Sequence, residues 1–226
     1  MSALIISFSG IDGAGKSTQI QKLREYFSAS GIPVTDLTFW DNVVMFPRLR
    51  AGFSRRVLQS DGNIGTPERP AERRDKNTQN APLLFGRSIL HFFDVVNLRR
   101  IVRKAKSQNS GVVIFDRYIY DQLAALPMQS WWARTFARLL LRVAPKTDLS
   151  YILDADPEAA RARKPEYPIE FMRKYRSSYL ELCRLANLKL ISPGSVDEVH
   201  QAIVDTFSTC VLEKQNDSRM PSAVVA

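Results

Sequence analysis

A glycine-rich segment near the N-terminus constrains the fold of this chain more than any other feature. Residues 10–17 read Gly-Ile-Asp-Gly-Ala-Gly-Lys-Ser and match the pattern GxxxxGK[ST]. They follow the apolar run 4–8 and precede a helix-like stretch over residues 18–27. Glycines let the backbone turn so that successive N–H groups point into one concavity, and the following helix adds its positive N-terminal end. A strand, a phosphate-binding loop and a helix are therefore expected in this order.

The same pattern assigns chemistry to individual side chains of the loop. Lys16 can reach the outer phosphates of a nucleoside triphosphate, and the hydroxyl of Ser17 can hold Mg²⁺. A chance match at a glycine-rich turn is the alternative, but the strand–loop–helix context argues against it. We therefore expect ATP and Mg²⁺ as cofactors. The residues predicted to line their site are Gly10, Asp12, Gly13, Ala14, Gly15, Lys16, Ser17 and Thr18.

Length and composition indicate a globular protein. The 226 residues can bury a substantial core in one domain or a small two-lobed one, and 45% of them are hydrophobic. No apolar run is long enough to span a bilayer, and the chain enters its first strand without a basic leader segment. Cys183 and Cys210 lie in helix-like segments and are not expected to form a disulfide or a metal pair. A cytoplasmic protein is expected.

The charge balance narrows the choice of partners. Lys and Arg number 32 against 23 Asp and Glu, a net charge of +9, which suits nucleic acid, an anionic membrane or a polyanionic small molecule. The basic residues are spread over segments 48–76, 134–142 and 161–164, with no compact basic tail. This distribution favours phosphate ligands, so we expect a small-molecule phosphate acceptor, no nucleic-acid partner and no membrane span.

The segment 130–143 is predicted to be a basic amphipathic helix. One face carries Trp132, Phe136, Leu139, Leu140 and Val143, and the opposite face carries Arg134, Arg138 and Arg142. Such a helix could lie on anionic lipid. Packing on a sheet or at a homodimer interface, with a solvated basic face, is the favoured alternative because nothing else in the chain points to lipid.

Strand and helix patterns alternate along the chain. The strands are expected at Leu4–Ser9, Val34–Trp40, Val112–Asp116, Leu149–Asp154 and Leu188–Ile191. The helices are expected at Ser17–Ser30, Leu83–Gln108, Ser130–Val143, Pro157–Lys164, Pro168–Ala186 and Val196–Leu212. This alternation predicts an α/β fold, a three-layer sandwich with a five-stranded parallel sheet between helices. We expect one domain over residues 1–212, an atypical loop or insertion at 41–82, and a flexible tail at 213–226.

A charged pair follows the third predicted strand. The apolar run 112–115 ends at Asp116, and Arg117 comes next. An acidic group at this edge can hold the water shell of Mg²⁺ beside Ser17. The alternative is an aspartate that merely caps a turn, although two charges at the mouth of an apolar strand are costly without a ligand.

Several of these segments resemble thymidylate kinases. Residues 8–19 are similar to the phosphate-binding loop of that family, and Asp116-Arg117-Tyr118 resembles its acidic–Arg–Tyr signature. Residues 154–163 are similar to the segment that enters the lid, and 168–182 to the helix that leaves it. Residues 191–199 resemble the final strand and the loop that flanks the base of ATP. The resemblance covers roughly residues 3–40 and 84–210.

The resemblance implies a P-loop NTPase fold and transfer of the γ-phosphoryl group of ATP to a nucleoside monophosphate, dTMP by default. It implies that Asp12 touches the acceptor sugar and Arg117 the acceptor phosphate. Gly194 and Ser195 would flank the ATP base. Some members carry an arginine at the position of Gly13, and others supply it from the lid, here the short segment 155–170. The residues that the resemblance marks as catalytic are Lys16, Asp116, Arg117, Arg161 and Arg163.

The acceptor side departs from the family pattern. Residues 39–44 read Phe-Trp-Asp-Asn-Val-Val where an Arg-Glu-Pro-Gly-Gly-Thr-like stretch is usual. Phe92 supplies an aromatic on the base-binding helix, but Val96 takes the place of the arginine that follows one turn later. Ala125 stands where an aromatic residue excludes a ribose 2′-hydroxyl. The acceptor-binding candidates are Asp12, Asp41, Phe92, Arg117 and Tyr118.

Two other functions stay open at this point. A kinase for a nucleoside or metabolite hydroxyl would need a general base, and Asp41 is the candidate. An ATP-binding regulatory module, or one that binds nucleic acid through residues 48–76, is the other. Intact Lys16, Ser17 and Asp116 argue against an inactive enzyme, and the basic segment lacks the dense aromatic residues of a single-strand binder.

Overall fold

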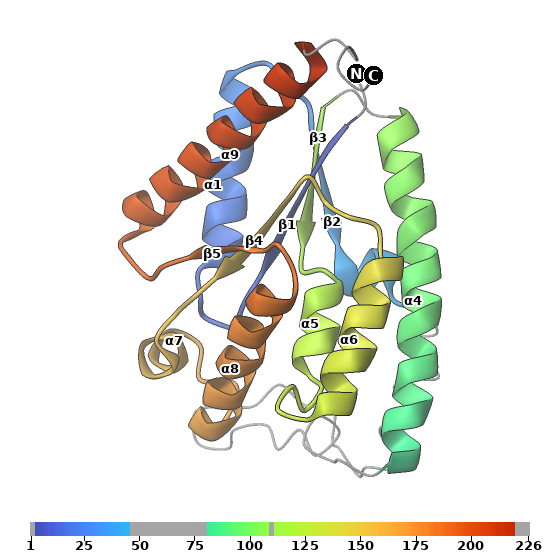
Figure 1. Ribbon diagram of the computed structural model, residues 1–226. Helices are drawn as coiled ribbons and strands as arrows, with labels where there is room; N and C mark the ends of the chain where they lie inside the picture. Colours follow the sequence, from blue (N-terminus) through green and yellow to red (C-terminus); the bar gives the residue numbers. More distant parts are fainter. Residues whose placement is uncertain (1–2, 46–80, 109–110, 220–226) are drawn as a thin grey trace, which may run out of the picture.

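Five parallel strands form the centre of the molecule (Figure 1). The computed structural model describes residues 3–45, 81–108 and 111–219. The strands are β1 Leu4–Ser9, β2 Val34–Thr38, β3 Val112–Asp116, β4 Leu149–Leu153 and β5 Lys189–Ile191. Their order is β2-β3-β1-β4-β5, and every neighbouring pair is parallel. All carboxyl ends therefore lie at one edge of the sheet, and the expected five-stranded parallel sheet is confirmed.

Helices cover both faces of this sheet (Figure 1). They are α1 Lys16–Ala29, the π-helix η1 Phe39–Val43, α4 Ala81–Gln108, α5 Ile119–Ala124, α6 Trp131–Val143, α7 Pro157–Arg163, α8 Ile169–Leu185 and α9 Val196–Arg219. Helices α1 and α9 pack on one face, and α4, α5, α6 and α8 lie on the other. The three-layer arrangement follows from strands that are apolar on both sides.

Alternation along the strands divides the core into two clusters. In β1, Ile6 and Phe8 face α1 and α9, where they pack with Leu23 and Phe27. Ile5 faces the opposite cluster, which the helices on the other side cover. Each fully buried side chain of this size contributes roughly 1.5–3 kcal/mol. The sheet is thus fixed from both sides, and its carboxyl edge is left to carry the loops.

The end of β2 differs from the sequence-based expectation. A strand was expected up to Trp40, but pairing stops at Thr38 and the chain turns into η1. The side chain of Asn42 explains this, because its Oδ1 accepts the N–H of Thr38 at 2.7 Å. Phe39 and Val43 are both buried by the turn, which anchors it against the core.

Two helices also differ from expectation. Helix α5 was missed because it is only six residues long and buried all round, so it carries no amphipathic pattern. Helix α9 continues to Arg219 instead of ending at Leu212. The basic segment 48–76, most of the predicted 41–82 insertion and residues 220–226 lie outside the described part of the chain.

Helix α6 packs on the protein core. Its buried residues are Ala133, Ala137 and Leu140, and Trp132 and Phe136 lie against the same cluster. Leu139, expected on the apolar face, is 58% exposed. The small side chains at 133 and 137 set the contact stripe, which turns Leu139 outward. Of the helices in the described ranges, none has the length and apolar content to cross a bilayer.

Candidate functional site

The glycine-rich loop lies at the carboxyl end of β1 with its backbone in conformations that favour glycine. Gly10 and Gly13 have φ of +141° and +82°. A Cβ on Gly10 would lie 2.5 Å from the carbonyl oxygen of Leu153, and one on Gly13 would overlap that of Ala160. Gly15, with φ of 89°, caps α1 without a side-chain hydrogen bond. The first amides of α1 are left for an anion, as in phosphate-binding loops.

Lys16 is folded back over this loop. Its side chain is buried, and Nζ donates to the carbonyl oxygens of Gly10 and Ile11, each at 2.9 Å. Burial, and then the positive charge of Arg117, lower the pKa of Lys16 to about 8, although the carboxylates of Asp12, Asp121 and Asp116 oppose the shift. The ammonium thus sits in the concavity where a phosphate would supply a stronger counter-charge than two carbonyls do.

Arg117 reaches the same loop from the end of β3. Its φ of 67° is the one positive value among the described non-glycine residues, and its N–H donates to the carbonyl of Phe8 at 2.9 Å. The guanidinium donates to the carboxylates of Asp12 and Asp121. Burial alone would lower the pKa of Arg117, but these two carboxylates more than offset it and raise the pKa well above its ordinary value. Asp12 and Arg117, the two residues expected to contact the acceptor, are therefore in direct contact with each other.

Asp121 is a site residue that sequence reasoning missed. It is 1% exposed, and its carboxylate accepts from four donors. Oδ2 accepts from Ser9 Oγ at 2.6 Å and the N–H of Tyr118 at 3.1 Å, and Oδ1 accepts from Tyr179 at 2.7 Å and Arg117 at 2.9 Å. Each of the two carboxylate oxygens thus accepts two hydrogen bonds, and these four bonds hold the carboxylate rigidly. In the sequence, its position four residues after Arg117 is the signal that could have indicated this ion pair.

Asp116 ends β3 beside the loop. In register it pairs with Phe8 of β1 and Thr38 of β2. Its Oδ1 is buried and has no hydrogen-bond partner among the described residues. Burial raises the pKa of Asp116, although Lys16 and Arg117 oppose the shift. A buried carboxylate oxygen without a donor fits a hard cation such as Mg²⁺, which takes oxygen ligands.

The lid segment begins with α7. Asp156 caps this helix by accepting the N–H of Ala159 at 2.9 Å, with Pro157 in the first turn. Arg161 donates from Nε to the carbonyl of Tyr167 at 3.2 Å, which closes the connection between α7 and α8. Arg163 is exposed. The two predicted lid arginines therefore have different surroundings.

Comparison with known proteins gives one consistent result. No protein-family model matches the chain. A probable thymidylate kinase of Pyrococcus abyssi is 29% identical over 218 residues, which cover 90% of this chain and 95% of the relative. One from Archaeoglobus fulgidus is 24% identical over 222 residues, 95% of this chain and all of the relative.

Two solved structures share the fold. The crystal structure of thymidylate kinase from Ehrlichia chaffeensis has a TM-score of 0.59 at 18% identity, and covers 92% of this chain and 99% of that chain. The structure of thymidylate kinase from Candida albicans has a TM-score of 0.61 at 19% identity, and covers 92% of each. Over nearly its whole length the chain is therefore similar to probable thymidylate kinases, and it shares the fold of the two solved thymidylate kinases.

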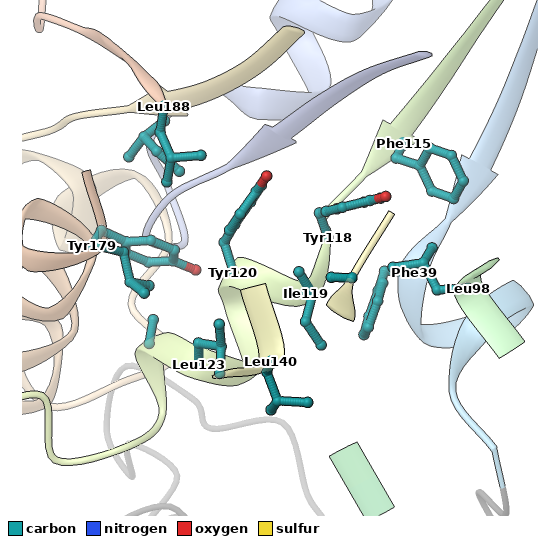
Figure 2. Packing of buried hydrophobic residues seen from close by; sticks show 14 of the residues in the cluster. Phe39, Leu98, Phe115, Tyr118, Ile119, Tyr120, Leu123, Leu140, Tyr179 and Leu188 are labelled. Atoms are coloured by element: carbon teal, nitrogen blue, oxygen red, sulfur yellow. The ribbon is translucent and has the colours of Figure 1, made fainter. Parts of the chain in front are cut away.

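One expected acceptor residue of this chain lies in the core instead. Tyr118 is fully buried, and its hydroxyl donates to the carbonyl of Pro145 at 2.8 Å. Figure 2 shows its ring among the buried aromatics, with Phe115 and Phe39 as neighbours at centroid distances of 5.4 and 6.4 Å. The positive φ of Arg117 reverses the side-chain alternation after β3, which sends Arg117 toward the loop and Tyr118 inward.

The two remaining acceptor candidates, Phe92 and Asp41, lie on α4 and η1. Phe92 on α4 is 51% exposed and its ring meets that of Phe93 at 6.4 Å, while the buried face of α4 presents Asp94. Asp94 accepts hydrogen bonds from the side chain of Gln122 and the N–H of Met45. Asp41 is exposed in η1, at the carboxyl edge of the sheet.

The loop predicted to flank the ATP base precedes α9. Ser195 and Glu198 cap the helix reciprocally, since Ser195 N–H donates to Glu198 Oε2 at 2.8 Å and Glu198 N–H donates to Ser195 Oγ at 3.3 Å. The buried side chain of Gln19 in α1 donates to the carbonyl of Val196 at 2.8 Å. This bond ties the loop that contains Gly194 and Ser195 to the helix that follows the phosphate-binding loop.

Proposed function

We propose that this protein transfers the γ-phosphoryl group of ATP to the phosphate of dTMP and releases ADP and dTDP. One observation carries the proposal: Arg117 is fixed between Asp12 and Asp121 at the lip of the loop that holds Lys16. Two cations at one edge of the sheet suit two phosphates that must approach each other. Full-length similarity to probable thymidylate kinases supports the choice of acceptor.

The donor would bind on the amides of the loop and the first turn of α1. Lys16 would exchange the carbonyls of Gly10 and Ile11 for phosphate oxygens. Ser17 and Asp116 would hold Mg²⁺, which when bound neutralises charge on the donor phosphates. The unpartnered Oδ1 of Asp116 and the exposed position of Ser17 are the observations that fit this role.

The acceptor would bind from the other side of the loop. Arg117 would hold its phosphate, and Asp12 would accept a hydrogen bond from the sugar hydroxyl. No side-chain nucleophile is needed, because the acceptor phosphate oxygen attacks directly and the protein contributes positions and charge. Asp121 would keep Arg117 in place while Asp12 is engaged with the sugar.

A lid arginine would complete the charge around the transferring group. We assign this role to Arg163, because it stands three residues after Ala160 and so shares the face of α7 that contacts Gly13. Arg161 is engaged with the carbonyl of Tyr167 and would stabilise the closed connection to α8. A closing arginine is worth roughly 10³-fold or more in rate.

A coupled ADP-release assay against nucleoside monophosphates, nucleosides and sugar phosphates tests the proposal. We expect turnover with dTMP and its loss in Lys16→Ala, with circular dichroism unchanged. Turnover with thymidine but not with dTMP would support the hydroxyl-acceptor alternative, and Asp41→Asn would then abolish it. Full turnover by Lys16→Ala would show that the loop is not the donor site.

A further inference from the structure

A large pocket lies at the edge of the sheet opposite to the phosphate-binding loop. Its volume is about 1060 Å³, and its lining includes Leu149 and Ser150 at the start of β4 and Lys189 at the start of β5. The ends of α6 and α8 and part of α9 complete it. Figure 1 shows these helices around β4. Strand β4 runs roughly 13 Å from this pocket to Leu153, which contacts Gly10.

The pocket carries an excess of positive charge. Its basic lining residues are Arg138, Arg142, Lys146, Arg184 and Lys189, and its acidic ones are Asp148 and Asp205. The acidic groups are engaged elsewhere. Asp148 accepts the N–H of Ile5 at 2.8 Å and lies 3.7 Å from Lys106, and Asp205 accepts from Gln201 at 2.7 Å.

Most of these basic side chains form no ion pair with another described residue. Arg184 pairs with Glu181 at 3.2 Å. Arg138, Arg142, Lys146 and Lys189 are each outside ion-pair distance of any carboxylate in the parts of the chain that the structure describes. Like charges gathered around one hollow repel each other, and an anion in the pocket would remove this repulsion.

The floor of the pocket is polar although it is buried. Tyr120 and Ser150 are 7% and 5% exposed, and their hydroxyl oxygens are 3.0 Å apart. The hydroxyl of Thr147 also contacts Ser150, and Ser7 donates to Ser150 at 3.3 Å from β1. In Figure 2 the hydroxyl of Tyr120 turns away from Leu123 and Leu140. Hydroxyls can rotate to donate or accept, so this floor can pair with a polar ligand.

We propose that this pocket binds a small molecule that carries two or more phosphates, at a site separate from the phosphoryl-transfer site. Basic residues line the pocket on both sides of the start of β4. Arg142 lies in α6 and Lys146 in the chain that follows it, and Lys189 lies in β5. A single phosphate would leave one side unpaired. The volume suits a ligand of nucleotide size.

Inorganic tripolyphosphate is the probe, added to the full chain after Mg²⁺ and one equivalent of ADP have filled the phosphate-binding loop. The charge reversal Arg142→Glu/Lys146→Glu is compared with Arg99→Glu/Arg103→Glu, which makes the same change of charge at exposed positions of α4 outside the pocket. Binding is measured by calorimetry and located by amide shifts. We expect shifts at Ser150 and Lys189, and at least tenfold weaker binding in the pocket variant alone.

Three outcomes would decide against the pocket, and two others would identify the class of its ligand. Absence of binding, shifts confined to residues 10–17, or equal weakening in both double variants would overturn the proposal. A second equivalent of ADP that the pocket variant loses would identify the ligand as a nucleotide. Binding of tripolyphosphate without a second ADP equivalent would identify a non-nucleotide polyphosphate. Because these experiments measure binding and not phosphoryl transfer, their results do not depend on which acceptor the kinase reaction uses.

Discussion

Arg117 Nη1 and Asp121 Oδ1 lie 2.9 Å apart, one helical turn from each other. The arginine is held in a left-handed backbone conformation, and the carboxylate is gripped by three further donors. The strained residue is therefore fixed by a buried, fully bonded partner. Such strain persists where the surroundings determine it, and it is typical of functional positions.

The first prediction concerns this pair. In Asp121→Asn one carboxylate oxygen is replaced by an NH₂ group, so only the remaining oxygen can accept hydrogen bonds. The NH₂ group would then face donors that it cannot pair with, such as the N–H of Tyr118. We expect KM for the acceptor to rise at least tenfold while KM for ATP changes less than twofold. The free energy of unfolding should fall by roughly 1–3 kcal/mol.

Tyr179→Phe is the matched control for that variant. It removes one neutral donor to Asp121 Oδ1 and leaves the carboxylate charge beside Arg117. We expect a smaller loss of stability and an acceptor KM near that of the unmodified protein. An equal rise of the acceptor KM in both variants would show that packing, and not the charge pair, positions Arg117.

The second prediction separates steric overlap from backbone strain. Gly13 and Gly15 have similar φ of 82° and 89°, but a Cβ on Gly13 overlaps the Ala160 carbonyl and one on Gly15 meets nothing within 4 Å. Gly15→Ala should lower the free energy of unfolding by about 1–2 kcal/mol. Gly13→Ala should lower it by at least 1 kcal/mol more. Urea unfolding without ligand measures both, and equal losses would contradict the overlap.

The third prediction concerns pH and Lys16. Its pKa in the folded protein is about 8, below the ordinary 10.5. Between these two values the unfolded chain binds the proton that the folded one has released, so this group makes stability rise with pH in that window. A bound polyphosphate favours the charged ammonium. Affinity for ADP with Mg²⁺ should therefore fall above pH 8, by up to about tenfold per pH unit.

Calorimetry between pH 7 and 9.5 in two buffers of different ionisation enthalpy measures this effect. Proton uptake on binding should appear above pH 8 and be small at pH 7. Lys16→Met should bind weakly at every pH and take up fewer protons. Constant affinity across the range, with no proton uptake, would mean that Lys16 is not the phosphate ligand.

The fourth prediction distinguishes the two lid arginines. Arg163→Ala should lower kcat at least 100-fold with little change in melting temperature, because the exposed side chain acts only during transfer. Arg161→Ala should lower kcat less and lower the melting temperature, since it loses the bond to Tyr167. Steady-state kinetics and thermal unfolding measure both. A larger fall in kcat for Arg161→Ala would reverse the assignment.

The sequence was sufficient for the loop, β1 and β3 because these depend on local patterns: a glycine-rich turn and apolar runs that end in charges. It did not reveal Asp121, since that carboxylate gains its role from Ser9 and Tyr179, which are 112 and 58 residues away in the chain. The inward direction of Tyr118 depends on the positive φ of Arg117, which the residue type does not predict. Asn42 ended β2 through a side-chain bond that strand patterns do not include.

The contact between Gly13 and Ala160 makes the phosphate-binding loop and α7 neighbours without a side chain between them. A triphosphate that shifts the loop by even a fraction of an ångström would push directly on the backbone of α7. The missing side chain at position 13 is what allows the two backbones to approach each other this closely.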